Sequence, residues 1–199
     1  MRKIVVLTFV TLDGIMQAPG GPEEDTSDGF NHGGWTVPYF DESLGKTMDE
    51  QMGKPFDLLL GRKTYDIFAS YWPHHDDDGA ALNNATKYVV SHEQRDLSWG
   101  PSQLVTGDVV AEIKKIKRED GKMLQVHGSS VLIQTLLKND LIDELWLKIF
   151  PVALGDGKRL FEDNILPAAF MLEAVQTTPK GVIVASYKRA GEVLTGSFA

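Results

Sequence analysis

Short apolar and β-branched runs recur along this chain, and segments with helical spacing lie between most of them. The strand-like runs span residues 4–10, 56–60, 88–90, 104–106, 123–126 and 145–150. One segment between them has Val109, Ile113 and Ile116 on one face and basic residues on the other, and residues 131–136 show the same spacing. Strands that alternate with helices predict an α/β fold with a mainly parallel sheet, covered by helices on both faces.

The C-terminal part departs from this pattern. Residues 169–177 and 182–187 have the composition of two further strands, and the turn-like sequence Thr178-Pro179-Lys180-Gly181 lies between them. Proline suits the second position of a tight turn and glycine the fourth. We therefore predict an antiparallel hairpin that forms one edge of the sheet.

Composition and charge limit the class of protein. The chain has 199 residues, of which 42% are hydrophobic, and this is enough for a single domain, residues 1–199, with a substantial core. No apolar run has the length of a membrane span, and polar residues interrupt the apolar start without a signal-peptide cleavage site, so we expect a cytoplasmic protein. The lack of cysteine excludes disulfides and thiolate metal sites. A net charge of −8 argues against nucleic acid and anionic membranes as partners.

The first glycine motif follows the strand at residues 56–60. Arg62 and Lys63 come directly after Gly61, in what we expect to be the first turn of a helix, where the helix dipole disfavours cations. A bound anion would reverse this effect, because backbone N–H groups, both cations and the Thr64 hydroxyl would converge on it. An Arg62–Asp66 ion pair on a solvated helix face is the alternative, and spacing alone leaves the two open.

The second glycine motif follows the strand at residues 123–126. Gly128 allows a close backbone approach, and Ser129 or Ser130 can cap a following helix while donating to a phosphate. Plain capping by serine is the alternative. Neither motif is the glycine fingerprint of Rossmann domains or a Walker loop. A dinucleotide pyrophosphate between the two helix starts would explain both motifs.

The order of these motifs resembles that in dihydrofolate reductases. The segments concerned are residues 60–65 (LGRKTY), 87–91 (KYVVS) and 127–130 (HGSS). Residues 11–14 (TLDG), 141–145 (LIDEL) and 151–161 (PVALGDGKRLF) resemble more closely the C-terminal reductase domain of bifunctional riboflavin-biosynthesis deaminase/reductases and its stand-alone relatives. The resemblance spans nearly the whole chain. It implies a single dihydrofolate reductase-like domain with NADPH as cofactor.

The resemblance also implies which residues bind the cofactor. Arg62 corresponds to the residue that holds the adenosine 2′-phosphate, helped by Ser91, and a fixed guanidinium gives a reason to prefer NADPH over NADH. The remaining cofactor-binding residues that it implies are Gly61, Lys63 and Thr64 at the first helix start, His127, Gly128, Ser129, Ser130 and Val131 at the second, and Val10, Thr11 and Phe150 beside the nicotinamide.

The candidates on the substrate side are Asp13, Trp35 and Asp41. Asp13 and Asp41 are the candidate catalytic carboxylates, and Trp35 and Asp41 are the candidate substrate-binding residues. Asp13 could reach a pocket at the carboxyl edge of the sheet or simply form a turn with Gly14. Asp41 could bind a heterocycle or begin a helix. Trp35 could stack on a planar ring or close the core.

The loop at residues 17–34 is the main departure from the riboflavin-pathway reductases. Its length and its content of Gly, Pro, Asp and Glu predict an active-site lid or a disordered insertion, and we favour the lid. Its acidic residues would repel a substrate phosphate; they are Glu23, Glu24, Asp25 and Asp28. An arginine-bearing segment that would hold such a phosphate is missing, and Lys46, Lys158 and Arg159 are the alternative cations.

A run of histidine and aspartate at residues 74–78 resembles a metal-binding cluster. Adjacent residues point in different directions, and the run lies between Trp72-Pro73 and Gly79. We therefore expect a solvated loop and no metal site.

These observations lead to one functional hypothesis and two alternatives. We expect an NADPH-dependent oxidoreductase that transfers hydride to a small heterocyclic substrate, resembling 5-amino-6-(5-phosphoribosylamino)uracil reductase. The alternatives are dihydrofolate reduction, which needs Asp41 to face the pocket, and a non-catalytic NADPH-binding sensor. We also expect a homodimer, formed through an exposed sheet edge after Leu145.

Overall fold

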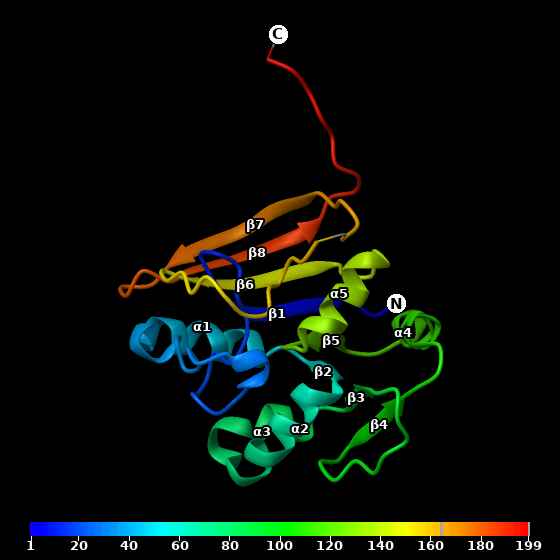
Figure 1. The fold of residues 1–199 in the computed structure, drawn as a ribbon. Helices are drawn as coiled ribbons and strands as arrows, with labels where there is room; N and C mark the ends of the chain where they lie inside the picture. Colours follow the sequence, from blue (N-terminus) through cyan, green and yellow to red (C-terminus); the bar gives the residue numbers. More distant parts are fainter. Residues whose placement is uncertain (164, 199) are drawn as a thin grey trace.

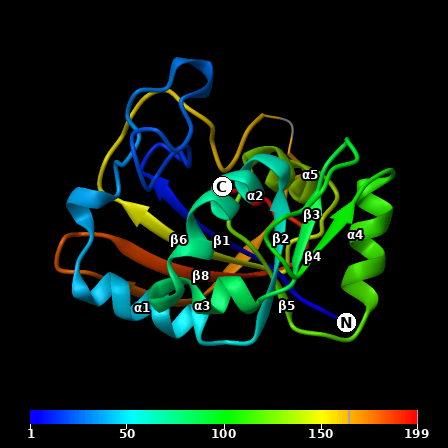
Figure 2. The same ribbon diagram turned by 90° about the horizontal axis from the view of Figure 1, so that it is seen from below.

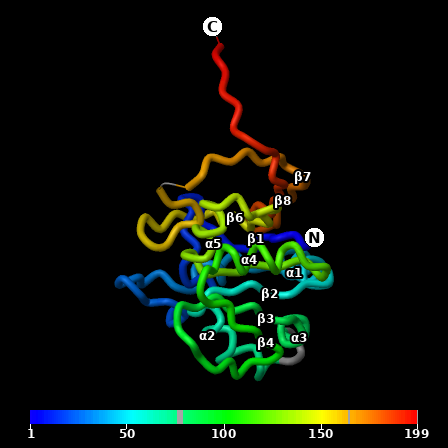
Figure 3. Tube along the Cα trace, turned by 90° about the vertical axis from the view of Figure 1, so that its right-hand side faces the viewer, coloured from blue at the N-terminus to red at the C-terminus, as the bar shows by residue number. Residues whose placement is uncertain are grey.

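A computed structural model describes residues 1–163 and 165–198, without the side chains of residues 76–78. Eight strands form one sheet in the order β4-β3-β2-β5-β1-β6-β8-β7. Figure 3 shows the strands labelled in it, from β7 at the top through β8, β6, β1, β2 and β3 to β4 at the bottom. The strands are β1 (Ile4–Thr11), β2 (Phe56–Gly61), β3 (Lys87–Val90), β4 (Ser102–Val105), β5 (Met123–Val126), β6 (Glu144–Phe150), β7 (Phe170–Thr177) and β8 (Ile183–Arg189). The first six are parallel, and β8 and β7 are antiparallel additions. The predicted α/β fold is confirmed.

Helices cover both faces of this sheet (Figures 1 and 2). The α-helices are α1 (Glu42–Met52), α2 (Arg62–Tyr71), α3 (Asp76–Asn84), α4 (Val109–Arg118) and α5 (Ser130–Lys138). Helices α4 and α5 pack on one face, where Ile113 and Leu132 join Val6 in one core cluster. Helices α2 and α3 pack on the other face, where Tyr65 and Leu82 join a cluster that includes strand residues of β2.

Strand β1 explains why the sheet needs both layers. Val5 and Leu7 pack with Trp146 on one face, while Ile4 and Val6 join the core under α4 and α5. Both sets are fully or nearly fully buried. A central parallel strand that is buried on both faces therefore appears in the sequence as a nearly continuous apolar run.

The predicted C-terminal hairpin is confirmed. The N–H of Gly181 donates to the carbonyl of Thr178 at 2.9 Å, and Gly181 has a φ of +84°, a conformation that glycine adopts without a Cβ penalty. After β8 the chain leaves the sheet and runs away from the body (Figure 1).

The predicted sheet edge after Leu145 is wrong. Strand β6 lies between β1 and β8, because the hairpin returns along it and pairs with it from Glu144 to Ile149. The exposed edge on this side is β7 instead.

The prediction of a loop at residues 74–78 is also wrong in part. The short 3₁₀-helix η3 (Trp72–His74) precedes His75, and α3 begins at Asp76. The helix forms here because Leu82 and Ala85 pack into the core beside β2. Among the side chains that the structure describes, no group of three or more His, Asp or Glu residues could hold a metal ion.

The described helices are all too short or too polar to cross a membrane.

Candidate active site

A cavity of about 1350 Å³ lies at the carboxyl ends of the parallel strands. Ligand pockets in proteins usually measure about 300–1,000 Å³, so this cavity has room for a cofactor and a substrate together. The residues lining it come from the ends of β2, β3 and β5, from the first turns of α2 and α5, from α1 and from the loop at residues 17–34. Open α/β sheets commonly bind ligands at this edge.

The two glycine motifs contact each other at this edge. A Cβ on Gly61 would collide with the side-chain oxygen of Ser129, and a Cβ on Gly128 would lie 2.8 Å from Oγ1 of Thr64. Each glycine therefore allows the start of the opposite helix to approach. The N-termini of α2 and α5 are brought together in a way that larger residues would prevent.

The same two helix starts differ from those of α1 and α4 in their capping. Asp41 accepts a hydrogen bond from the N–H of Leu44 at 2.9 Å, and Asp108 accepts one from Ala111 at 3.0 Å. In the described part of the chain, α2 and α5 receive no such side-chain cap, although Ser129 occupies the capping position of α5. Capping of α5 by the Ser129 side chain, which we expected either alone or together with phosphate binding, is therefore absent. Uncapped N–H groups at two helix starts favour an anion in the cavity.

Arg62 lies at the rim of this cavity. Its guanidinium is 3.4 Å from Asp66, but Arg95 holds the same carboxylate with two shorter contacts of 3.0 and 2.6 Å. The Arg62 side chain is 54% exposed, so it can turn toward a ligand at little cost. Ser91 also lines the cavity, and its hydroxyl donates to the backbone oxygen of Glu93 at 3.0 Å. Ser91 would have to release this oxygen before donating to a phosphate.

Most of the predicted cofactor-binding residues line the cavity. They are Gly61, Arg62, Lys63, Thr64, Ser91, His127, Gly128, Ser129, Ser130 and Val131. Val10, Thr11 and Phe150 lie outside it. Val10 belongs to the core under α4 and α5, the Thr11 hydroxyl donates to Asp13 at 2.5 Å, and Phe150 is fully buried.

The predicted substrate-side residues Asp13, Trp35 and Asp41 do not line the cavity, and each has a structural role. Asp13 accepts a hydrogen bond from the N–H of Gly155 at 2.8 Å and so holds the segment after β6. Burial alone would raise the pKa of Asp13, but hydrogen bonds from Thr11 and Gly155 lower it below its ordinary value. Asp41 caps α1 and also accepts from the N–H of Lys180 at 3.2 Å. Trp35 is buried in the core, and the centroid of its ring lies 5.3 Å from that of Phe150.

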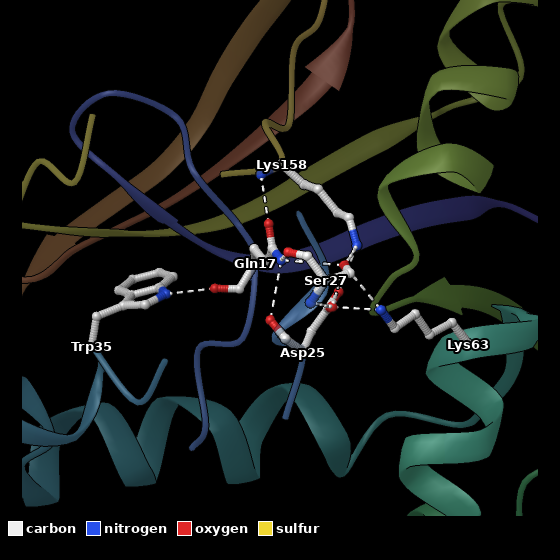
Figure 4. A network of polar contacts seen from close by, with 6 residues as sticks. All are labelled: Gln17, Asp25, Ser27, Trp35, Lys63 and Lys158. Atoms are coloured by element: carbon white, nitrogen blue, oxygen red, sulfur yellow. Dashed lines mark hydrogen bonds and ion pairs between the residues drawn. The ribbon is translucent and has the colours of Figure 1, made fainter. Parts of the chain in front are cut away.

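The loop at residues 17–34 lines the cavity and is tied to two other parts of the chain (Figure 4). Asp25 lies 2.5 Å from Nζ of Lys63 on α2 and 2.7 Å from Nζ of Lys158 after β6. Burial alone would raise the pKa of Asp25, but hydrogen bonds from both lysines hold it well below its ordinary value. These contacts support the interpretation of the loop as a lid.

Lys46, Lys158 and Arg159 are the cations that could replace the missing arginine segment in binding a substrate phosphate. Of these three, Lys158 lines the cavity. Arg159 donates to the backbone oxygens of Asp13 and Gly155 and so supports the chain after β6.

Sequence reasoning missed Lys148 on β6. This lysine is fully buried in the cavity wall, and its Nζ donates to the side-chain oxygen of Gln51 on α1. Burial lowers the pKa of Lys148 to about 7, and burial together with Lys148 lowers the pKa of His127 to about 3. A lysine within a largely apolar strand is the sequence signal that could have revealed it.

Solved structures with the same architecture define the class of this domain. A riboflavin biosynthesis-like protein of Shewanella sp. PV-4 has 23% identity and a TM-score of 0.67, and the match covers 96% of this chain and 99% of that one. A dihydrofolate reductase of Enterococcus faecalis, complexed with NADP(H) and RAB-propyl, has 14% identity and a TM-score of 0.61, with 94% and 96% covered. The chain therefore has the dihydrofolate reductase-like fold.

The family can be stated more narrowly. The model of the RibD C-terminal domain matches residues 2–184, so the chain belongs to this family. The uncharacterized Bacillus subtilis proteins YyaP and YwjB are relatives. YyaP is 27% identical over 192 residues, which is 94% of each chain. YwjB is 25% identical over 167 residues, and the match covers 81% of this chain and 84% of YwjB. A pyrimidine reductase-like protein of Corynebacterium diphtheriae shares the fold at 13% identity and a TM-score of 0.61, with 96% and 93% covered.

Proposed function

We propose that the protein is an NADPH-dependent reductase that transfers hydride to a small, flat heterocyclic substrate. The observation that carries this proposal is the meeting of two uncapped helix starts, those of α2 and α5, in one large cavity. Membership of the RibD C-terminal domain family supports it, as does the shared fold with a dihydrofolate reductase complexed with NADP(H).

The residues at the two helix starts fit a dinucleotide phosphate. Ser129 keeps its hydroxyl free of a capping role, and Gly61 and Gly128 leave room for close contact between the loops. Backbone N–H groups of α2 and α5 would hold the pyrophosphate, and Arg62 at the rim would hold the 2′-phosphate. When bound, the cofactor supplies the hydride, and the chain supplies position and electrostatics.

Apolar side chains in the cavity lining suit a flat ring. Met16, Phe40, Met48 and Met52 line the cavity together with the glycine-rich start of the loop at residues 17–34. Asp13 and Asp41 do not line the cavity, and both have lowered pKa values, so we propose water as the source of the proton. Dihydrofolate reduction is the less supported alternative, because Asp41 caps α1 rather than facing the cavity.

A turnover experiment separates the enzyme from a sensor. The protein should oxidise NADPH when given a panel of conjugated heterocycles, measured by the loss of nicotinamide absorbance. Saturable NADPH binding without turnover of any of them would favour the sensor.

Replacing Arg62 by alanine should weaken NADPH binding about tenfold or more and leave NADH binding nearly unchanged. A charge-assisted hydrogen bond contributes about 1.5–3 kcal/mol, and NADH lacks the 2′-phosphate that would receive it. Calorimetric titration of both variants with both cofactors measures this. Arg118→Ala, at the C-terminal end of α4, is the matched control. Equal losses for NADPH and NADH would remove the 2′-phosphate assignment.

We also propose that the protein forms a homodimer through β7. On this edge strand, Met171, Leu172 and Val175 are 59%, 48% and 56% exposed to solvent. Such exposure is unusual for apolar residues on a free sheet edge. Light scattering should give twice the mass of the chain, and Val175→Glu should give a monomer. A monomeric wild-type protein at micromolar concentration would contradict the dimer.

A further inference from the structure

Two lysines from distant elements converge on Asp25 (Figure 4). Nζ of Lys63, in the first turn of α2, lies 2.5 Å from Oδ1 of Asp25, and Nζ of Lys158 lies 2.7 Å from Oδ2. The hydroxyl of Ser27 lies 2.5 Å from Oδ1 and accepts from Lys158 at 2.6 Å. We call these four residues the Asp25 cluster. Its two ammonium groups outnumber its one carboxylate.

The backbone around the Asp25 cluster is held in place by Gln17. The amide of Gln17 donates to the backbone oxygens of Asp25 and Ser27 at 3.1 and 3.0 Å, and its oxygen accepts from the N–H of Lys158 at 3.0 Å. The indole N–H of Trp35 in turn donates to the backbone oxygen of Gln17 at 2.8 Å. Asp25 is therefore positioned by a buried frame, and its side chain is only 12% exposed.

The groups around Asp25 are those that bind a phosphate monoester. Two ammonium groups and a hydroxyl form charge-assisted hydrogen bonds to phosphate oxygens as readily as to a carboxylate. Lys63, Lys158 and Asp25 all line the cavity, so the cluster is reached from the space where a substrate would lie. The carboxylate of Asp25 occupies the position of such an anion.

We propose that Asp25 determines substrate specificity by filling an anion subsite, formed by Lys63, Lys158 and Ser27, that would otherwise accept a substrate phosphate. The substrate class is then a heterocycle without a phosphate group, and this assignment rests on the proposed reductase function. It refines the expectation from the sequence: the acidic loop excludes phosphate because Asp25 occupies the lysines, rather than by repulsion from unpaired acids.

The test is calorimetric titration with inorganic phosphate in the absence of cofactor, where any phosphate bound at the starts of α2 and α5 is a background shared by all variants. The wild-type protein should bind phosphate at least tenfold more weakly than Asp25→Asn, because the substitution removes the competing charge. Asp28→Asn is the matched control, since Asp28 is an exposed carboxylate of the same loop and asparagine tolerates its φ of +60°. The double variant Asp25→Asn/Lys158→Met should lose the gained affinity.

Several outcomes would overturn the proposal. They are equal phosphate affinity of wild type and Asp25→Asn, the same gain in Asp28→Asn, and persistence of the gain in the double variant. If Asp25→Asn fails to fold, the comparison of wild type with Lys158→Met still tests the proposal. Tight phosphate binding by wild type that is lost in Lys158→Met would contradict the proposal. Absence of such binding would support it. Phosphate binding needs no NADPH, so the two proposals can fail separately. A negative phosphate result would not contradict the reductase function. A lack of reductase activity would not change the phosphate affinities.

Discussion

Replacing Gly128 by valine should abolish measurable NADPH binding while the fold stays intact by circular dichroism. A Cβ at this position would lie 2.8 Å from Oγ1 of Thr64 and 3.4 Å from its Cγ2, and the valine methyl groups would crowd the loop further. Overpacking of this kind costs about 1–3 kcal/mol, which here would separate the starts of α2 and α5 where the pyrophosphate is proposed to lie. Fluorescence titration with NADPH measures the effect.

Gly196→Val serves as the control for Gly128→Val. Gly196 lies after β8, outside the cavity lining, and a Cβ there would meet nothing within 4 Å. This variant should bind NADPH like the wild type. Normal NADPH binding by Gly128→Val would mean that the second glycine motif only shapes the start of α5.

Replacing Lys148 by methionine should stabilise the protein by about 1–4 kcal/mol at pH 6, as removal of a buried charge often does. The acceptor of Lys148 is the amide oxygen of Gln51 rather than a carboxylate, so little offsets the desolvation of the ammonium. Because burial lowers its pKa to about 7 from 10.5, the unfolded chain binds more protons than the folded one between these values. The penalty is therefore complete below about pH 7 and is lost as the pH rises toward 10.5, so this lysine makes stability rise with pH.

Denaturant unfolding at pH 6 and pH 10 measures this difference. The gap in unfolding free energy between wild type and Lys148→Met should shrink on going to pH 10, by up to about 4 kcal/mol at about 1.4 kcal/mol per pKa unit. Lys115→Met, at a lysine that is 69% exposed on α4, is the control and should show no such change. A gap that is the same at both pH values would show that Lys148 titrates in its ordinary range.

Features set by neighbouring residues were predictable from the sequence. The strands and the C-terminal hairpin were predicted from apolar and β-branched runs in the sequence. The observed strand ends lie within two residues of those expected. The two glycine motifs were predictable for the same reason, since a strand, a glycine and a helix start are consecutive in the chain. The physical information for these features is local.

Features set by distant partners could not be predicted. Asp13 is held by Gly155, and Asp41 by Lys180, each across about 140 residues of chain, so their structural roles depend on the folded sheet. The pairing of Asp25 with Lys158 likewise needs the loop at residues 17–34 to lie over the end of β6. Burial of Lys148 depends on the packing of α1 against β6, which the strand sequence alone does not contain.

A crystal structure of the protein soaked with NADPH would test the central proposal most directly. We expect density for the pyrophosphate between the N-termini of α2 and α5, in contact with Ser129 and Ser130, and for the 2′-phosphate beside Arg62. NADPH bound elsewhere, or both helix starts without phosphate density at saturating NADPH, would contradict it.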